Sequence, residues 1–442
     1  VWGVPLPIFI NKKTKEPLRD QKVIDRIASI YEKQGSDCWF TDDPKVFLGD
    51  DYNPSDFEKL NDIVEVWFDS GSTHSFVLEK RKDLKWPADM YLEGSDQHRG
   101  WFHSSLLESC GTRGRAPFES ILSHGFVVDG KGLKMSKSTG NVISPEDILK
   151  NYGADILRVW VASSDYAEDL RIDKSILAQH AESYRKIRNT FRFILGNLKD
   201  NYEQQDFDKL DFKKFDELEQ YILHKLFTID KSVKYNLKNY NFHKLYKELL
   251  NFCNLDLSSF YFDIRKDVLY CDSTNSKKRK DCVVVLNIIL ESLLKWFAPI
   301  LVFTTEEIYS LVSNKEESIH EHSFVAIPSK WENIKLNEKW IKLLKIKQEA
   351  NIAIEEKRAN KEIGSSLEAE LKIITDKKNF ELLEGIDLAE YFITSKAEKE
   401  RAEDVKKIKI IVKKTTGNKC PRCWKILEIN CIRCQEAKLN KN

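Results

Sequence analysis

The sequence predicts an α/β region with parallel strands, followed by a helical bundle, a small α/β unit and a cysteine-containing module. Through about residue 165, short apolar runs alternate with helical stretches and glycine turns, a pattern typical of α/β folds. Glycine is absent from residues 200 to 363, as expected for a helical bundle. Four of the nine cysteines lie near the C-terminal end. The length of 442 residues suggests about three domains.

The candidate strands of the α/β region are short apolar runs. They cover Val1 to Ile10, Ile63 to Phe68, Met90 to Leu92, and Ile121 to Val128. The chain begins abruptly on an apolar valine, which we interpret as a cut inside a domain.

A short helix is predicted to follow the last of these strands. Ser144 can cap it, Pro145 suits the first helical position and Gly153 can close it. A second helix is expected from about Ala154 to Val161.

Long helices are predicted from about Ile176. One apolar face is formed by residues that recur every three or four positions, namely Tyr184, Ile187, Phe191, Ile194 and Leu198. Further helices are expected over 214–236, 241–262 and 281–297. A capping box at Thr304-Thr305-Glu306-Glu307 predicts the start of the next one.

The C-terminal third is predicted to begin with a charged helix over 338–361. The segment Ile363-Gly364-Ser365-Ser366 breaks this helix. A small α/β unit is expected over 367–415, with strands near Glu370–Thr375 and Ile408–Val412.

Composition and charge restrict the class of protein. Lysine and arginine number 71 and aspartate and glutamate 70, for a net charge of +1, which leaves room for local basic patches. No run of 18 apolar residues exists, so no membrane span is expected. The first residues lack the features of a signal peptide. Five scattered cysteines suit free thiols in a reducing compartment, and we expect a cytoplasmic protein: Cys38, Cys110, Cys253, Cys271 and Cys282.

The first candidate site is the block from Met90 to Phe102, where a strand runs into a glycine and polar residues open a helix. Ligands of parallel sheets bind outside the carboxyl ends of the strands. Glu93 can bind an ammonium group or a ribose hydroxyl there, and Gly94 allows a ligand close to the backbone. Asp96 and Gln97 supply an acceptor and an amide. The alternative interpretation is a solvated strand-to-helix turn.

The second candidate site is a glycine-rich loop that carries Lys134-Met135-Ser136-Lys137-Ser138. Two lysines on a mobile loop can neutralise triphosphate charge as it moves to the leaving group. The loop lacks the glycines that precede the single Gly-Lys-Ser/Thr of a Walker loop. A basic surface loop is the alternative interpretation.

The third candidate site is a pair of Cys-x-x-Cys motifs. Its four cysteines are Cys420, Cys423, Cys431 and Cys434, and four thiolates meet the demand of a structural, tetrahedral zinc ion. Two disulfides are the alternative. The seven-residue spacer between the motifs is shorter than is usual for four-cysteine zinc sites. The neighbouring Arg422, Trp424, Lys425 and Arg433 either meet RNA by charge and stacking or are solvated.

These motifs resemble the isoleucyl-tRNA synthetases of the bacterial type, within the class I aminoacyl-tRNA synthetases. The lysine loop resembles the KMSKS loop of class I. The string from Glu93 to Phe102 is similar to the isoleucyl enzyme rather than to the valyl, leucyl or methionyl ones. Four further segments resemble it in the right order: Trp2 to Pro5, Val66 to Ser72, Gly153 to Arg158, and Cys420 to Trp424.

The resemblance implies a domain for each part of the chain. Residues 1–165 would be the C-terminal half of a Rossmann-type catalytic domain, and 166–337 a helical anticodon-binding domain. Residues 338–415 would be a connecting helix and small α/β subdomain, and 416–442 the zinc knuckle. The family's ATP-binding histidine motif and inserted editing domain are not in this sequence, so the chain alone is not expected to complete the reaction.

The resemblance also assigns roles to single residues. Glu93 matches the position that contacts isoleucyl-adenylate, with Gly94, Asp96, Gln97 and His124 in the same pocket. Lys137 matches the ATP-binding lysine, and Lys134 its companion in catalysis. The remaining assignments are weaker. Ser72 and His74 are expected to be pocket scaffolding, and Arg185, Arg188 and Arg192 either form a solvated helix face or meet tRNA phosphates.

The implied function is a ligase that attaches L-isoleucine to tRNA(Ile) through isoleucyl-adenylate. Its expected partners are tRNA(Ile), ATP with Mg²⁺, and L-isoleucine, with no membrane, and the expected state is a monomer. Isoleucine exceeds valine by one methylene, which binding alone discriminates poorly. Two alternatives stay open: a truncated, non-catalytic tRNA-binding protein, and a related synthetase for valine.

Overall fold

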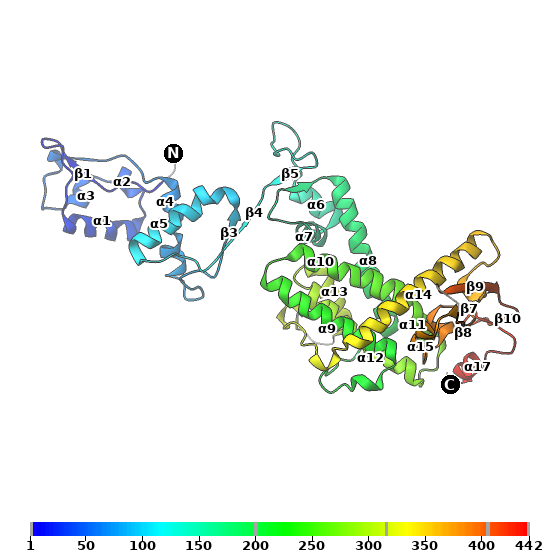
Figure 1. Ribbon diagram of the computed structural model, residues 1–442. Coiled ribbons are helices and arrows are strands. Elements are labelled where there is room, and N and C mark those ends of the chain that lie inside the picture. Colours follow the sequence, from blue (N-terminus) through cyan, green and yellow to red (C-terminus); the bar gives the residue numbers. More distant parts are fainter. Residues whose placement is uncertain (1–2, 199–201, 314–316, 404–406, 440–442) are drawn as a thin grey trace. The chain divides into compact units, whose positions relative to one another are not determined.

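The computed structural model describes residues 3–198, 202–313, 317–403 and 407–439. The chain forms two compact units, one of Val1–Val127 with Tyr166–Asp169 and one of Val128–Asp165 with Leu170–Asn442 (Figure 1). This division falls inside the predicted first domain, and the predicted boundaries at 165, 337 and 415 stay predictions. Val1 and Trp2 of the first predicted strand, and residues 440–442 of the predicted knuckle, lie outside the described residues.

The first unit opens with a small subdomain around a buried tryptophan. Strand β1 (Phe9–Asn11) pairs antiparallel with β2 (Phe57–Lys59). Helices α1 (Gln21–Gln34), α2 (Cys38–Thr41) and α3 (Pro44–Leu48) lie between them in sequence. The Trp39 side chain is fully buried, with its ring centroid 5.0 Å from that of Phe9 and 5.1 Å from that of Phe47. The predicted strand from Val1 to Ile10 is therefore confined to its last residues.

The rest of the first unit is a parallel βαβ element. Strand β3 (Tyr91–Gly94) pairs in parallel with β4 (Ile121–His124), and α5 (Trp101–Arg113) connects them. The expectation of parallel strands is met here. The predicted strand from Ile63 to Phe68 is wrong, because only Ile63 makes a bridge, to Pro5, and α4 (Val66–Gly71) follows. The Glu65 carboxylate starts that helix by accepting a hydrogen bond from the Trp67 N–H at 2.7 Å.

The predicted strand from Ile121 to Val128 is two strands. The chain leaves β4 after His124 and resumes in β5 (Val127–Asp129). The backbone between them turns because the Gly125 N–H donates to the Tyr166 carbonyl at 2.9 Å and the Phe126 N–H to the Asp169 carboxylate at 2.8 Å.

The second unit starts with the short helices that the sequence predicts. Helix α6 (Pro145–Tyr152) is capped by the Ser144 hydroxyl, which accepts from the Glu146 N–H at 3.2 Å. Gly153 ends it with φ at 84°, a conformation that favours glycine. Helix α7 (Ala154–Ser163) follows at once, and β6 (Leu170–Ile172) precedes the bundle.

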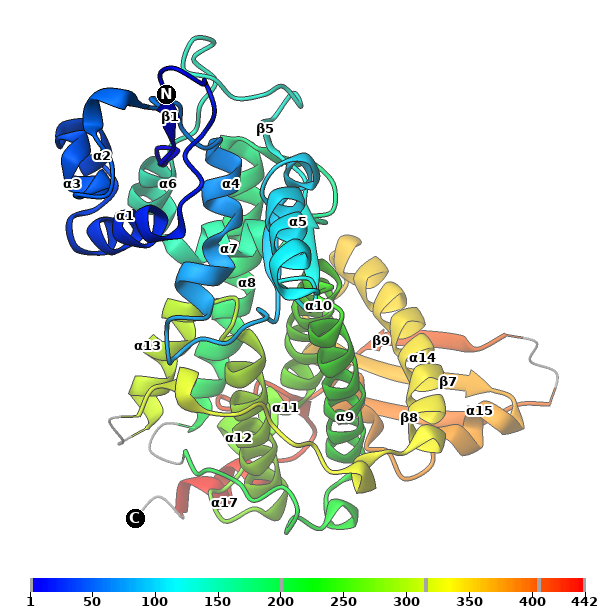
Figure 2. The same cartoon turned by 90° about the vertical axis from the view of Figure 1, so that its left-hand side faces the viewer.

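The helical bundle holds most of the apolar core. Its helices are α8 (Lys174–Leu198), α9 (Glu217–Lys238), α10 (Phe242–Asn251), α11 (Phe262–Cys271), α12 (Lys277–Phe297), α13 (Val302–Val312) and α14 (Ile334–Ala359) (Figure 2). A π-helical segment, Phe252–Tyr261, joins α10 to α11, so the predicted helix over 241–262 runs on to Cys271. The predicted apolar face of α8 is buried except for Tyr184, which is half-buried.

The predicted capping box at Thr304 to Glu307 is wrong. Helix α13 begins at Val302, so both threonines lie inside its first turn. The N–H groups of Phe303 and Thr304 instead donate hydrogen bonds to the carboxylate of Asp155, which lies on α7.

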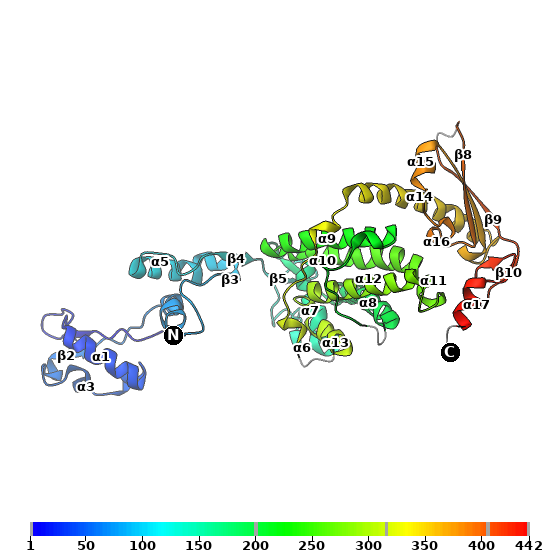
Figure 3. The same ribbon diagram turned by 90° about the horizontal axis from the view of Figure 1, so that it is seen from below.

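The C-terminal third forms a three-stranded sheet with two short helices. Strand β7 (Ala369–Thr375) lies between β8 (Lys396–Arg401), to which it is parallel, and β9 (Lys409–Lys414), to which it is antiparallel (Figure 2). Helices α15 (Lys377–Leu382) and α16 (Leu388–Tyr391) precede β8 (Figure 3). The sequence indicates β7 and β9 but not β8, whose residues are all charged except Ala397. Ion pairs Lys396–Glu370, at 3.2 Å, and Lys372–Glu400 accompany its pairing with β7.

The chain ends in a short β-ribbon and a helix. Strand β10 (Asn418–Lys419) pairs antiparallel with β11 (Ile426–Leu427), and α17 (Ile432–Leu439) follows. Among the described residues no helix is long and apolar enough to span a membrane.

Candidate functional sites

The predicted adenylate residues of the first unit lie at the carboxyl ends of β3 and β4. Parallel register places Glu93 beside Ser123 and Gly94 beside His124. Asp96 and Gln97 follow Gly94 directly, in a 3₁₀ turn that leads into α5. Because ligands of parallel sheets bind at this edge, the structure brings the five predicted residues together where a ligand can reach them.

Gly94 leaves room for the Asp96 side chain in this cluster. A Cβ atom on Gly94 would lie 2.7 Å from the Asp96 Oδ1 and 3.8 Å from the His124 Cε1. The His124 Nδ1 lies 2.8 Å from the Gly125 carbonyl oxygen, so Nδ1 carries the proton and Nε2 is left as an acceptor. The Gln97 amide donates to Asp96 at 3.1 Å and accepts from the Trp101 N–H at 3.0 Å. Gln97 therefore also holds the start of α5.

The side chain of Glu93 is exposed at this edge of the sheet. Among the described residues it makes no ion pair and no hydrogen bond through its side chain. It is available for a ligand group, as the sequence predicts for a residue at the end of a strand.

Ser72 and His74 support the backbone of α4. The Ser72 hydroxyl donates to the Asp69 carbonyl at 2.8 Å. His74 is 1% exposed, and its Nδ1 lies 3.0 Å from the Gly71 carbonyl. Both contacts are local, and the expected role as pocket scaffolding stays a prediction.

The lysine loop of the second unit is closed at its base by Asp129 and Asn141. The Asn141 amide donates to the Asp129 carboxylate at 2.9 Å and to the Lys134 carbonyl at 3.2 Å. Asp129 also accepts from the Leu133 N–H at 2.8 Å. The hydrogen bond from Asn141, with those from the backbone, lowers the pKa of the Asp129 carboxyl, so this anchor is ionised near neutral pH. Both residues flank the Lys134–Ser138 string, and no sequence signal singles them out as a clamp.

The two lysines of the loop are exposed. Two hydroxyls organise the turn around Lys137, since the Ser136 Oγ accepts from the Thr139 N–H at 3.3 Å and the Thr139 hydroxyl donates to the Ser136 carbonyl at 3.2 Å. Within the described part of the chain, neither the Lys134 nor the Lys137 ammonium group forms an ion pair. Both charges are therefore free to meet a polyanion.

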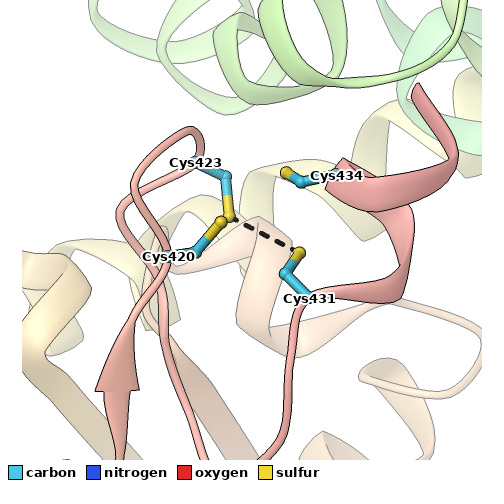
Figure 4. A group of neighbouring side chains, drawn as sticks. All are labelled: Cys420, Cys423, Cys431 and Cys434. Atoms are coloured by element: carbon cyan, nitrogen blue, oxygen red, sulfur yellow. Dashed lines mark hydrogen bonds between the residues drawn. The ribbon is translucent and has the colours of Figure 1, made fainter. Parts of the chain in front are cut away.

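The four predicted cysteines form one cluster. Their sulfur atoms all lie within 4.8 Å of one another, from the turn after β10 and the start of α17 (Figure 4). The Sγ atoms of Cys423 and Cys431 are 3.8 Å apart. Tetrahedral zinc with Zn–S bonds of about 2.3 Å requires an S–S separation of about 3.8 Å. The cluster could hold a metal ion of this kind, and the short spacer does not keep the two motifs apart.

Basic residues of the knuckle bind helix α11. Arg433 donates two hydrogen bonds to Asp267, at 2.6 and 3.0 Å, and Arg422 donates to the Tyr270 carbonyl at 3.1 Å. Lys425 lies 4.0 Å from Asp267. All three side chains contact α11 or the residues it carries, although the Arg433 side chain stays 34% exposed. A role in RNA binding stays a prediction. Trp424 alone keeps an open face, being 61% exposed.

The arginine stripe of α8 is partly paired. Arg185 pairs with Glu182 at 3.2 Å and Arg188 with Glu307 at 3.1 Å. Arg192 is exposed. A phosphate role for the stripe stays a prediction.

Two family models match the chain. The model described as tRNA synthetases class I (I, L, M and V) matches residues 1–173, and the one described as the anticodon-binding domain of tRNA ligase matches residues 219–374. The lysine loop and the β3–β4 cluster fall in the first match and most of the helical bundle in the second.

Isoleucine–tRNA ligases resemble the chain along nearly all of its length. The protein from Pelagibacter ubique is 65% identical over 98% of this chain. Those from Zymomonas mobilis and Caldicellulosiruptor bescii are 44% identical over 99% and 46% identical over 96%. The alignments cover 48%, 47% and 47% of these relatives, so the chain spans about half their length.

A solved structure has a similar fold. It is a LeuRS of Agrobacterium radiobacter K84 in a ternary complex with tRNA and LeuAMS, with a TM-score of 0.55 and 14% identity over 85% of this chain and 43% of that chain. At this identity the likeness concerns the fold alone. The two family models and the 65% identity to the Pelagibacter protein place the chain in the isoleucine–tRNA ligase family of the class I tRNA synthetases.

Proposed function

We propose that the chain supplies part of an isoleucine–tRNA ligase and acts in both steps of its reaction. The isoleucine carboxylate attacks the α-phosphorus of ATP, and pyrophosphate leaves. A terminal ribose hydroxyl of tRNA(Ile) then takes the isoleucyl group. The observation that carries the proposal is the cluster of Glu93, Gly94 and His124 at the carboxyl ends of β3 and β4, in a chain so similar to isoleucine–tRNA ligases.

The β3–β4 cluster would hold the adenylate. The unpaired Glu93 carboxylate suits the isoleucine ammonium group or a ribose hydroxyl. The space over Gly94 would admit the ligand, with Asp96 and Gln97 beside it. His124, with Nε2 free, offers one further acceptor.

Lys134 and Lys137 would act on the triphosphate. Their charges would stabilise the negative charge that develops on the leaving pyrophosphate, and this form of catalysis consists of positioning and electrostatic stabilisation. Mg²⁺ would accompany ATP. The clamp of Asp129 and Asn141 supports this role because it fixes the base of the loop while leaving both ammonium groups exposed.

The four-cysteine cluster would hold one structural zinc ion. Four thiolates fill a tetrahedral coordination sphere and leave no position for a substrate. Beside it, the exposed Trp424 is the remaining candidate for stacking on RNA.

The domain order follows from the same proposal. The region through 165 would be the second half of a Rossmann-type catalytic domain, 166–337 would bind the anticodon, and 338–415 would connect it to the knuckle of 416–442. The complete protein would be a cytoplasmic monomer.

The test uses the complete reading frame that contains this chain. We expect isoleucine-dependent ATP–pyrophosphate exchange, and we expect Lys137→Ala to lower its kcat by about 100-fold or more while isoleucine binding changes little. Lys131→Ala, which removes an exposed lysine earlier in the same glycine-rich segment, is the matched control. Equal exchange in Lys137→Ala and parent would refute the role of Lys137. Exchange that depends on valine would favour the valine enzyme, and tRNA binding without any exchange would favour a non-catalytic binding protein.

A further inference from the structure

Helix α7 contacts both ends of the turn between α12 and α13. Arg158 donates from Nη2 to the Pro299 carbonyl at 2.6 Å and from Nε to the Ile300 carbonyl at 3.1 Å. Asp155, one turn earlier on α7, lies against the start of α13. Its two oxygens accept the N–H groups of Phe303 at 3.2 Å and Thr304 at 2.8 Å.

These contacts match charge to helix polarity. The Pro299 and Ile300 carbonyls lie in the turn just beyond the end of α12, and a cation is favourable near the C-terminal end of a helix. The first N–H groups of a helix lack partners within the helix, and an anion is favourable there. Arg158 binds the turn after α12, and Asp155 binds the start of α13. Two residues one turn apart on α7 thus provide hydrogen-bond partners for both ends of the segment that connects α12 to α13.

The contact of Asp155 continues into α8. The Thr304 hydroxyl donates to Asp155 at 2.6 Å, so its oxygen is left to accept from the Tyr184 hydroxyl, 2.9 Å away. The Tyr184 oxygen in turn accepts from Arg188 at 3.0 Å, and Arg188 also pairs with Glu307. This chain of hydrogen bonds joins α7, α8 and α13.

Helix α7 is also the continuation of the lysine loop. The clamp residue Asn141 stands three positions before the cap Ser144, and α6 and Gly153 lead directly into α7. Ile148 of α6 is buried, and α6 packs against α7. The loop base is therefore tied to the bundle through α6 and through the contacts of Asp155 and Arg158.

We propose that Asp155 and Arg158 are positioning residues that hold the lysine loop on the helical bundle, so that Lys137 reaches the triphosphate in the right place. This inference rests on the proposed function. Neither residue is a candidate for contact with substrate, because the Asp155 side chain is buried with both oxygens bonded and Arg158 is bonded to the backbone. Both act through the loop.

The kinetic test is a double-mutant cycle in the complete enzyme. Asp155→Asn keeps the size of the side chain but removes the charge and one acceptor. We expect kcat for isoleucine-dependent pyrophosphate exchange to fall about tenfold, with the KM for isoleucine unchanged, because the loop is misplaced rather than the amino-acid pocket. In the Lys137→Ala background the same change should lower kcat less than twofold, because the side chain that it positions is gone. Arg158→Lys should retain part of the parent rate, since an ammonium group can still reach one carbonyl.

Asp147→Asn is the matched control, because Asp147 is an exposed acid of α6 with no side-chain partner among the described residues. It should leave kcat unchanged in both backgrounds. An equal fold loss from Asp155→Asn in the two backgrounds would overturn the proposal, since a general loss of folded enzyme is additive. No loss in the parent background would overturn it too.

Hydrogen exchange of the same proteins gives a readout that is independent of activity. In Asp155→Asn we expect faster exchange at the start of α13 and also across α6 and residues 129–141. Faster exchange confined to α13 would overturn the proposal even if no enzyme activity is found. One further outcome separates the two proposals. If the parent shows no isoleucine-dependent ATP–pyrophosphate exchange but Asp155→Asn still speeds hydrogen exchange across residues 129–141, the proposed function is refuted while the coupling between Asp155 and the loop stands.

Discussion

Arg433 donates two hydrogen bonds, of 2.6 and 3.0 Å, to the carboxylate of Asp267 on α11. Arg433 lies between the last two cysteines of the cluster. Asp272 adds an ion pair to the same guanidinium at 3.3 Å. Arg422 holds the equivalent position in the first motif and also reaches α11. Because both arginines stand inside Cys-x-x-Cys motifs, the fold that gathers the thiols also forms this contact. We therefore expect metal binding by the cluster to be linked to the attachment of the knuckle to the bundle.

We predict that Asp267→Asn weakens zinc binding. The change removes the charged partner of Arg433, and loss of a residue that supports metal ligands costs about 10- to 100-fold in affinity. Competition with a chromogenic chelator measures the effect. Asp263→Asn is the control, since this acid lies on the same helix and pairs with Lys266 instead. Equal zinc affinity in the Asp267 variant and the control would contradict the linkage.

The identity of the ligands is tested by removing single thiols. We expect one zinc ion per chain, lost or strongly weakened in Cys434→Ser because a hydroxyl is a poor substitute for a thiolate. Cys271→Ser is the matched control, because Cys271 is a buried fifth thiol packed against the cluster. Metal analysis after dialysis should still give one zinc ion for that variant. A loss of zinc from Cys271→Ser as large as that from Cys434→Ser would show that the four-ligand assignment is wrong.

Local sequence signals predict the parts of this fold that depend on neighbouring residues. Ser144, Pro145 and Gly153 give the bounds of α6, and the spacing of Ile187, Phe191 and Ile194 gives the buried face of α8. The two Cys-x-x-Cys motifs give the cysteine cluster.

The features that were missed depend on partners distant in sequence. Strand β8 is polar and becomes a strand only beside β7. The start of α13 is set by Asp155, which lies nearly 150 positions earlier in the sequence. The threonines near that start therefore gave a wrong prediction of where the helix begins. Arg433 likewise finds its partner 166 residues away, on α11.

The lysine loop should depend on its clamp. In Asn141→Ala, Asp129 and the Lys134 carbonyl both lose the hydrogen bond that the Asn141 amide donates, so the base of the loop opens. We expect kcat for isoleucine-dependent pyrophosphate exchange in the complete enzyme to fall about tenfold, as a shift of a catalytic group predicts. Asn151→Ala is the control, because that amide bonds only to the Asp147 carbonyl of its own helix. An unchanged kcat for pyrophosphate exchange in Asn141→Ala would show that the hydrogen bonds of Asn141 are not needed to position the loop.

Lys347 should make the stability of the second unit depend on pH. It is 5% exposed on α14, and burial lowers the pKa of its ammonium group to about 8. Nearby charges act in opposite directions, with Asp263 raising this pKa and Lys266 lowering it. The ammonium group donates to the Tyr391 carbonyl and lies 5.1 Å from the centroid of the Tyr391 ring.

The sign of the effect follows from the proton balance. Below pH 8 the lysine is charged in both states, and the folded state carries the full cost of burying that charge. Between about pH 8 and the usual lysine value of about 10.4 the unfolded chain binds more protons, so this residue makes stability rise with pH. Lys347→Met should remove this rise and raise the melting temperature at pH 7, as followed by circular dichroism from pH 7 to 10. Lys345→Met, an exposed neighbour, should leave the profile as it is. The same pH profile for Lys347→Met and the parent would show that Lys347 stays charged throughout.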